Sequence, residues 1–311
     1  MADLPSSYEA LQFPAIKLSH QPPSSPEVTP IVTVILNRPK AANAFSVEMQ
    51  TSLIHIFNLL STDPRVKCII LTGSDPANKI FCAGMDLSAV SDKPASQPLD
   101  AEGTVNRDTH RDGGGRVSLA IFRCNKPVIA AMNGSGVGVG ITMTLPCAIR
   151  VTHAKAKFGF VFARRGLSLE GCSSFFLPRL IGTSRAVHLA TTGSVYPATD
   201  KLLEGLFTVV EEPAGVLPKA IEIAEDVVKN CSAVSTTVMR DMIYRTPASP
   251  EEAHLNESKV IFDLFKGKDF IEGVQSFLQK RNPNLEGTMP KDAPSVWPWW
   301  KDALAGGKAR L

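Results

Sequence analysis

The sequence predicts an α/β protein in which strands dominate the first part of the chain and helices the last. Three apolar runs, Ile31–Leu36, Cys68–Thr72 and Pro127–Met132, are short and bounded by turn residues, as buried strands are. From Ser184 onward the pattern becomes mostly helical. Strands followed by helices indicate an α/β core joined to a helical C-terminal part.

Bulk composition excludes several classes of protein. The chain has 311 residues, a hydrophobic content of 44% and a charged content of 20%, which are ordinary for a soluble globular protein. The net charge is only +3 and no basic block is present, so we expect neither nucleic acid nor a membrane surface as partner. No apolar run is long enough to span a bilayer. The six cysteines never form C-x-x-C and no histidines pair on a helix face, so we expect free thiols and no metal site.

Four segments are expected along the chain. Residues 1–30 carry six prolines and look irregular, apart from a short strand at Ala15–Ser19. Residues 31–200 show a recurring strand, turn and helix, a loose ββα rhythm. Residues 201–285 are expected to be helical, and residues 286–311 to form a flexible tail.

Helical periodicity supports these assignments. Ser46 is a plausible N-cap, and the helix after it carries an apolar face of Met49, Leu53, Ile56, Phe57 and Leu60. Further helices are expected at about 184–192, 199–204, 217–229, 234–245, 250–266 and 269–280. Residues 91–115 are polar, end in a glycine triplet, and are interpreted as a long loop.

Two glycine-containing turns carry the strongest functional signal. Gly134–Gly140 follows an apolar strand, and Phe81–Leu87 is a second tight segment before a helix-like stretch. Together they suggest two backbone N–H groups aimed at one point, as in an oxyanion hole. The turn does not match G-x-G-x-x-G, has no Walker lysine and contains no G-x-S-x-G, so dinucleotide, P-loop and nucleophile-elbow interpretations fail.

Six motifs in order resemble the crotonase superfamily, the enoyl-CoA hydratases and isomerases. They cover about residues 30–285 and comprise 36–44 (LNRPKAANA), 81–87 (FCAGMDL), 126–134 (KPVIAAMNG), 157–159 (KFG), 176–182 (FLPRLIG) and 272–280 (EGVQSFLQK). The resemblance implies a spiral of ββα turns with a helical C-terminal trimerisation region, and hence a homotrimer or homohexamer. It also implies an acyl-CoA substrate, with no separate cofactor because coenzyme A is part of that substrate.

The same resemblance implies roles for individual residues. The oxyanion hole would come from the backbone N–H groups of Met85 and Val139. Coenzyme A would be contacted by a set drawn from three regions of the chain: Ala42, Ala83, Asp86, Leu87, Gly138, Phe277 and Lys280. The last two resemble residues of the final helix that close over coenzyme A, often from a neighbouring subunit.

The reaction depends on carboxylates, and here the chain departs from the hydratase pattern. Hydratases of the family use two glutamates, whose positions fall on Thr142 and Phe162. Neither residue has a carboxyl group that could transfer a proton. The nearby acid is Glu170, in a segment that resembles the peroxisomal Δ3,Δ2-enoyl-CoA isomerases. One carboxyl can take a proton from C2 and return it at C4, and apolar surroundings should raise its pKa. Glu170 could instead serve a helix N-terminus, and Asp108 and Asp112 are interpreted mainly as a solvated face.

The last residues suggest a compartment. The chain ends in Ala309-Arg310-Leu311, which resembles the S-K-L type of peroxisomal address read by an import receptor.

Three hypotheses follow. The first is a peroxisomal Δ3,Δ2-enoyl-CoA isomerase of unsaturated fatty-acid β-oxidation. The second is a hydratase or dehydratase acting on a specialised acyl-CoA, such as one feeding a secondary metabolite, with Thr142 or a loop aspartate assisting Glu170. The third is a non-catalytic CoA-binding oligomer in which Glu170 is structural.

Overall fold

The computed structural model describes residues 4–88 and 108–300. The chain forms two compact units, Met1–Ala224 and Glu225–Leu311, and the boundary falls inside helix α7 (Val216–Asn230). Within the described residues, every helix is too short or too polar to cross a bilayer.

A six-stranded sheet forms the base of the first unit. Its strands, in spatial order, are β1 (Ile16–Gln21), β2 (Ile31–Leu36), β3 (Cys68–Gly73), β5 (Val128–Met132), β7 (Ile149–His153) and β10 (Thr208–Val210). Only the β1–β2 pair is antiparallel; the other pairs in this sheet are parallel. The central strand β3 is buried along nearly its whole length, as expected for a parallel strand covered on both faces. The three predicted strands are therefore confirmed.

A second, smaller sheet positions the loops that matter for function. Its order is β4 (Ile80–Cys82), β6 (Ser135–Val137), β8 (Lys157–Gly159) and β9 (Val195–Pro197). The first three strands are mutually parallel and β9 is antiparallel to β8. The chain therefore leaves β4, β6 and β8 at one edge of this sheet.

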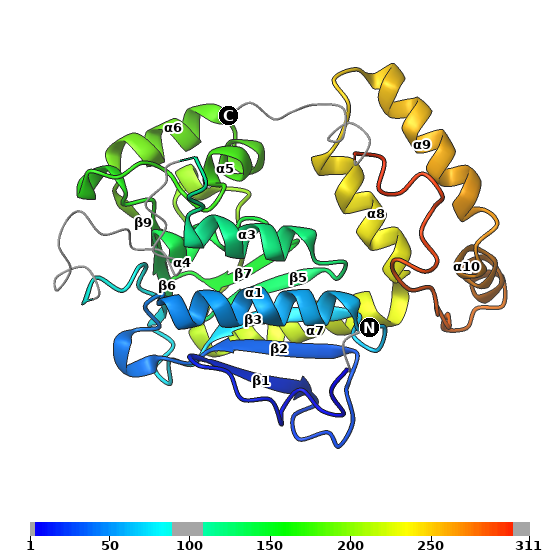
Figure 1. The fold of residues 1–311 in the computed structure, drawn as a ribbon, viewed down its shortest axis with the longest axis horizontal. Helices are drawn as coiled ribbons and strands as arrows, with labels where there is room; N and C mark the ends of the chain where they lie inside the picture. The colour runs from blue at the N-terminus through cyan, green and yellow to red at the C-terminus, as the bar shows by residue number, and fades with distance from the viewer. Residues whose placement is uncertain (1–3, 89–107, 301–311) are drawn as a thin grey trace. The chain divides into compact units, whose positions relative to one another are not determined.

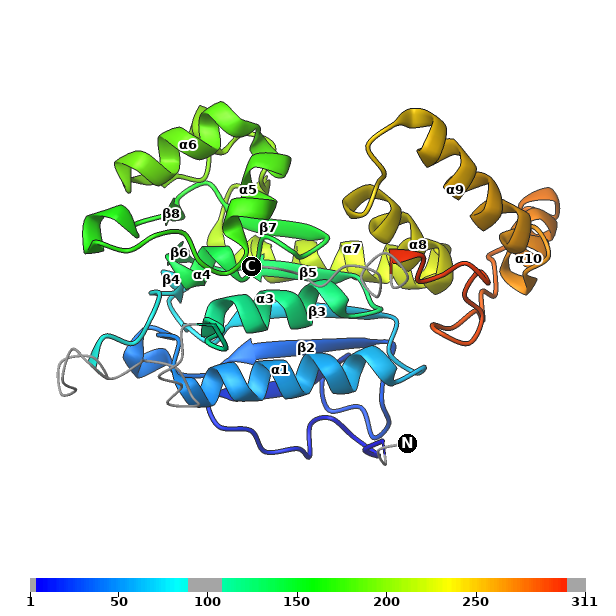
Figure 2. The same ribbon diagram turned by 45° about the horizontal axis from the view of Figure 1, so that its top comes forward.

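Helices α1 (Val47–Thr62) and α3 (Gly113–Arg123) lie side by side along the first sheet (Figures 1 and 2). The predicted cap of α1 is confirmed, because the Ser46 hydroxyl accepts the Met49 N–H at 3.3 Å. The predicted apolar face of α1 is fully buried. The start of α3 corrects the loop prediction: Gly113–Gly115 opens this helix, while residues 91–107 lie outside the described part of the chain.

Shorter elements complete the first unit. They are α4 (Val139–Thr142), α5 (Ser173–Ile181), α6 (Thr183–Thr192) and the 3-10 turns Pro39–Ala41, Ala163–Arg165, Lys201–Leu203 and Pro213–Gly215. The helix expected at 199–204 is only the turn Lys201–Leu203, capped by Asp200. Strands β9 and β10 flank that turn, and at three residues each they are too short for a periodic signal.

The N-terminal segment is packed onto the core by specific hydrogen bonds. Tyr8 is fully buried, and its hydroxyl donates to Asp63 Oδ2 at 2.9 Å. The Tyr8 backbone N–H donates to His20 Nε2 at 3.2 Å. The proline-rich composition correctly predicted little regular structure here, but long-range side-chain contacts hold the segment in place.

The second unit contains α8 (Ala233–Tyr244), α9 (Pro250–Leu264) and α10 (Lys268–Leu278), close to the predicted helices. The described part of the tail packs onto the helices of this unit. Met289 is buried against α8 and α9, and Trp297 Nε1 donates to Asp241 Oδ2 at 2.9 Å. The Trp297–Asp241 hydrogen bond joins residues 56 positions apart in sequence, which periodicity does not reveal.

Candidate active site

The loops of the two predicted turns emerge at the same edge of the second sheet. Strand β4 runs into Ala83–Leu87, and β6 runs into Gly138 and helix α4. Parallel pairing of Cys82 with Gly136 brings the ends of these strands together. A side chain at Gly140 would collide with the Cys82 carbonyl, so glycine is what lets α4 begin directly against the end of β4.

The backbone around Met85 leaves one amide unused. Phe45 donates its N–H to Gly84 O at 2.8 Å and accepts the Asp86 N–H at 3.0 Å, an alternation that turns the Met85 N–H away from Phe45. Val139 is the first residue of α4, where a helix leaves its N–H without an internal acceptor. In the part of the chain that the structure describes, neither amide donates to a backbone carbonyl. Their pairing as an oxyanion hole stays a prediction.

Most residues predicted to contact coenzyme A lie around these two loops. Ala42 has a left-handed backbone, with φ of 50°, and its carbonyl accepts the Ala83 N–H at 3.1 Å. The Leu87 side chain is exposed, and Gly138 adopts a positive φ next to α4.

Asp86, the remaining residue of this loop set, is occupied by protein partners. Its carboxylate accepts the Ser88 hydroxyl at 2.6 Å and pairs with Arg38 at 2.8 Å. The Ser88 hydrogen bond, followed by Arg38, holds the pKa of Asp86 below its usual range. Asp86 thus ties the Ala83–Leu87 loop to the segment before α1, and a contact with coenzyme A stays a prediction.

Glu170 is held by a hydroxyl from α4. Thr142 Oγ1 donates to Glu170 Oε1 at 2.5 Å, and the Glu170 carbonyl accepts the Ser173 hydroxyl at 2.6 Å. Burial raises the pKa of Glu170 to about 7, partly offset by the Thr142 hydrogen bond and reinforced by the nearby negative charge of Asp112. A carboxyl that is half protonated near neutral pH can both give and take a proton.

The glycine triplet explains how Glu170 comes to face the predicted oxyanion turn. A side chain at Gly114 would collide with Glu170 Oε2 and would also lie 3.2 Å from Val139 Cγ2. The backbone of Gly114 therefore touches both groups and brings Glu170 beside α4. Side chains at Gly113 and Gly115 would meet Gln50 and the Asp112 carboxylate. The triplet, interpreted from sequence as a loop, is a close-packing surface.

Asp112 was predicted as part of a solvated face, and it is exposed as predicted, but its carboxylate also has structural partners. It is the N-cap of α3, with Oδ2 accepting the Gly115 N–H at 2.6 Å and the Gly171 N–H at 3.2 Å. Its negative charge adds to the burial that raises the pKa of Glu170. Asp followed by a helix-forming apolar pattern is an N-cap signal that the three glycines concealed.

Thr142 and Phe162 occupy the two positions where the resemblance places the hydratase glutamates. Thr142 is buried and its hydroxyl serves Glu170. Phe162 is buried, and its ring lies near Gly138.

Phe277 and Lys280 belong to the second unit. Phe277 lies near the end of α10 and is 82% exposed, and Lys280 follows the helix with a positive φ. Their predicted contact with coenzyme A stays a prediction.

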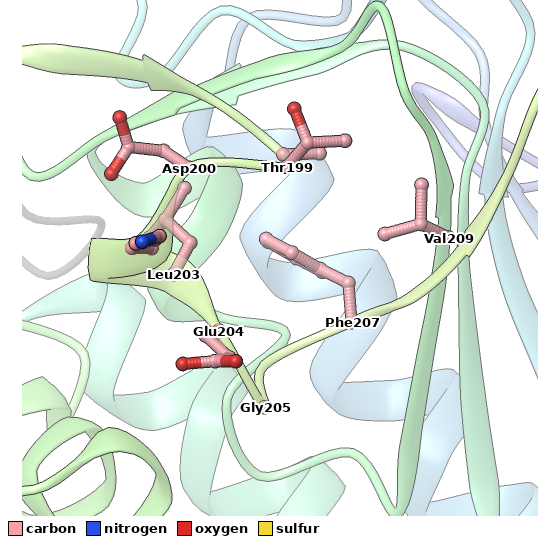
Figure 3. Close-up of a pocket in the computed structure, with 9 residues that line it drawn as sticks. Thr199, Asp200, Leu203, Glu204, Gly205, Phe207 and Val209 are labelled. Atoms are coloured by element: carbon pink, nitrogen blue, oxygen red, sulfur yellow. The ribbon is translucent and has the colours of Figure 1, made fainter.

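A separate pocket of about 310 Å³ is lined by residues in the segment from Ala198 to Val209. Figure 3 shows Phe207 pointing toward Thr199, with Asp200 and Glu204 at its rim. It contains none of the predicted site residues.

Comparisons with known proteins identify the family of this chain. The family described as enoyl-CoA hydratase/isomerase matches residues 27–288. Enoyl-CoA hydratase AFT3-1 of Alternaria alternata is 45% identical over 85% of this chain and 86% of its own length. Mevalonyl-coenzyme A hydratase sidH of Aspergillus fumigatus is 32% identical, covering 81% of this chain and 90% of its own. The crystal structure of an enoyl-CoA hydratase from Mycobacterium tuberculosis superposes with a TM-score of 0.73 and 28% identity, covering 88% of this chain and 100% of that one.

The family match spans most of the chain, and the solved structure shares its fold. This chain therefore belongs to the enoyl-CoA hydratase/isomerase family of the crotonase superfamily and is an enzyme.

Proposed function

We propose that this enzyme catalyses the reversible addition of water to the double bond of a 2-enoyl-CoA. The observation that carries the proposal is the Glu170 carboxyl, with a pKa of about 7, packed through Gly114 against Val139. The relatives named enoyl-CoA hydratase and mevalonyl-coenzyme A hydratase support hydration over the isomerisation expected first from the sequence.

The chemistry uses groups already in place. Addition of water at C3 pushes electrons onto the thioester oxygen, Glu170 delivers a proton to C2, and the Glu170 carboxylate takes up the proton that the water loses. The N–H groups of Met85 and Val139 are proposed to stabilise the enolate, and removal of one such donor typically costs about 2.7–4 kcal/mol. Ala42, Ala83, Leu87 and Gly138 are proposed to line the coenzyme A path around these amides.

Isomerisation of a 3-enoyl-CoA is the second candidate. One observation favours it: the two positions of the hydratase glutamates are Thr142 and Phe162, so neither supplies a carboxyl for activating water. Glu170 alone can move a proton from C2 to C4.

The two reactions differ in product, and both depend on Glu170. We expect a 2-enoyl-CoA to yield 3-hydroxyacyl-CoA, and Glu170→Gln to lower kcat by at least about 100-fold because proton transfer is lost. Glu204→Gln is the control, since that surface glutamate pairs with Arg185. Conversion of a 3-enoyl-CoA to its 2-isomer without hydration would favour the second candidate. Full activity of Glu170→Gln in both assays would refute both.

The raised pKa of Glu170 also predicts a pH-dependent stability. The folded protein binds this proton more tightly than the unfolded chain, so the associated stability is fully present below about pH 4.5 and is lost as pH rises through about 7. Glu170→Gln removes the buried charge. We expect its melting temperature to exceed that of the wild type at pH 8 and to match it at pH 5. Thermal unfolding measures this difference in melting temperature between the variant and the wild type. An equal difference at pH 5 and at pH 8 would contradict the raised pKa of Glu170.

We also propose that the second unit mediates assembly into a homotrimer or homohexamer. Its helices expose large apolar side chains, among them Ile243, Phe262, Phe265, Phe277 and Leu278. Phe277 and Lys280 would then close over coenzyme A bound to a neighbouring copy. We expect sedimentation equilibrium to give a trimer or hexamer mass, and a monomer at micromolar concentration would contradict this proposal.

Residues Ala309–Leu311 lie outside the described part of the chain, and we propose that they direct the enzyme to peroxisomes through an import receptor. A fluorescently tagged chain should accumulate in peroxisomes and lose this location when the last three residues are deleted. Unchanged import after the deletion would show that the address lies elsewhere.

A further inference from the structure

The Asp112 carboxylate lies against the backbone next to Glu170, although the two residues come from separate elements. Asp112 caps α3, and Glu170 precedes α5. Oδ2 of Asp112 accepts the N–H of Gly171, the residue directly after Glu170, at 3.2 Å. Asp112 is exposed, and its negative charge adds to the burial that raises the pKa of Glu170. Two neighbouring carboxyl groups resist ionising together, so one of them holds its proton to a higher pH.

The surroundings of the pair decide which group carries that proton. Asp112 receives two backbone N–H groups at the positive end of a helix of 11 residues, an arrangement that suits a carboxylate. Glu170 is the more buried of the two and receives one hydroxyl, from Thr142. The proton therefore resides on Glu170.

Among the described residues, Cys172 and Arg123 are the other titratable or charged groups that interact with this region. The thiol of Cys172, at the start of α5, is affected by both carboxyl groups, and its pKa is raised mainly by burial. Arg123, at the end of α3, acts on the same thiol in the opposite sense. From α4 the contact is the neutral Thr142 hydroxyl.

We propose that Asp112 and Glu170 work as one carboxyl pair holding a single proton, and that Asp112 supplies the second carboxyl group that hydration needs. This inference rests on the proposed hydration of an enoyl-CoA. Asp112 acts through Glu170 and is a positioning and proton-sharing residue.

The proton balance of hydration fits such a pair. The water oxygen forms its bond to C3 while the C2–C3 π bond breaks and its electrons pass to the thioester oxygen. The Glu170 proton is then transferred to C2, and the proton lost by water passes to the pair. The pair starts and finishes the cycle with one proton, and no other reactant is needed.

Asp112→Asn removes the negative charge of residue 112 but keeps a side chain that can cap α3. Asparagine accepts the Gly115 and Gly171 N–H groups nearly as well as aspartate, so we expect a melting temperature close to that of the wild type. Loss of the negative charge should lower the pKa of Glu170 by about one unit or more. We expect kcat for hydration to fall at least about 100-fold and the limb of the pH–rate profile that reports Glu170 to move to lower pH. Asp200→Asn is the matched control. Asp200 also serves as a cap, since it accepts the Leu202 N–H at 2.8 Å, and it is not among the proposed site residues.

A direct titration separates this inference from the proposed function. The Glu170 carboxyl can be followed by ¹³C NMR in labelled protein, with Glu170→Gln for assignment, whether or not the enzyme hydrates any substrate. A lower titration midpoint in Asp112→Asn supports the pair; an unchanged midpoint and unchanged kcat overturn it. Asp112→Ser, a neutral cap, replaces Asp112→Asn if that variant does not fold. Absence of hydration in the wild type with a shifted midpoint would refute the proposed function and leave the pair standing.

Discussion

The contact between the Glu170 carboxyl and the start of helix α3 is the constraint on which the site depends. Gly114 has no side chain, so the backbone of α3 approaches both Glu170 and Val139. Thr142 holds the other carboxylate oxygen from α4. Three elements, α3, α4 and the segment before α5, therefore converge on one acid. Without that convergence, Glu170 would be an ordinary residue near a helix N-terminus.

The fold supplies this convergence through the parallel strands of the second sheet. Strands β4, β6 and β8 are parallel and end at a common edge, so the turns that follow them lie close together. No pattern in the sequence shows this proximity directly. Backbone pairing around Phe45 and Met85 then orients one amide, and the start of α4 orients another. The ion pair of Arg38 with Asp86 joins the Ala83–Leu87 loop to the segment before α1.

The sequence predicted the parts with strong local signals. The buried strands, the Ser46 cap and the apolar face of α1 all follow from short-range patterns and are present in the structure. Glu170 was identified because its neighbours are apolar and it is the acid near the predicted turn. The exposure of Asp112 was predicted, but its role as the N-cap of α3 was missed because a glycine triplet reads as a loop. Its role also depends on a contact with Gly171, more than fifty residues away. The packed tail was missed for the same reason, since Trp297 finds its partner Asp241 only in three dimensions.

The most direct test of the account is a crystal structure with a bound, slowly reacting enoyl-CoA analogue. The account predicts a Glu170 carboxylate oxygen within about 3–3.5 Å of C2. It also predicts the thioester oxygen at about 2.7–3.1 Å from the amide nitrogens of Met85 and Val139. A complex in which the acyl group lies away from Glu170, or in which the thioester oxygen contacts neither amide, would contradict it.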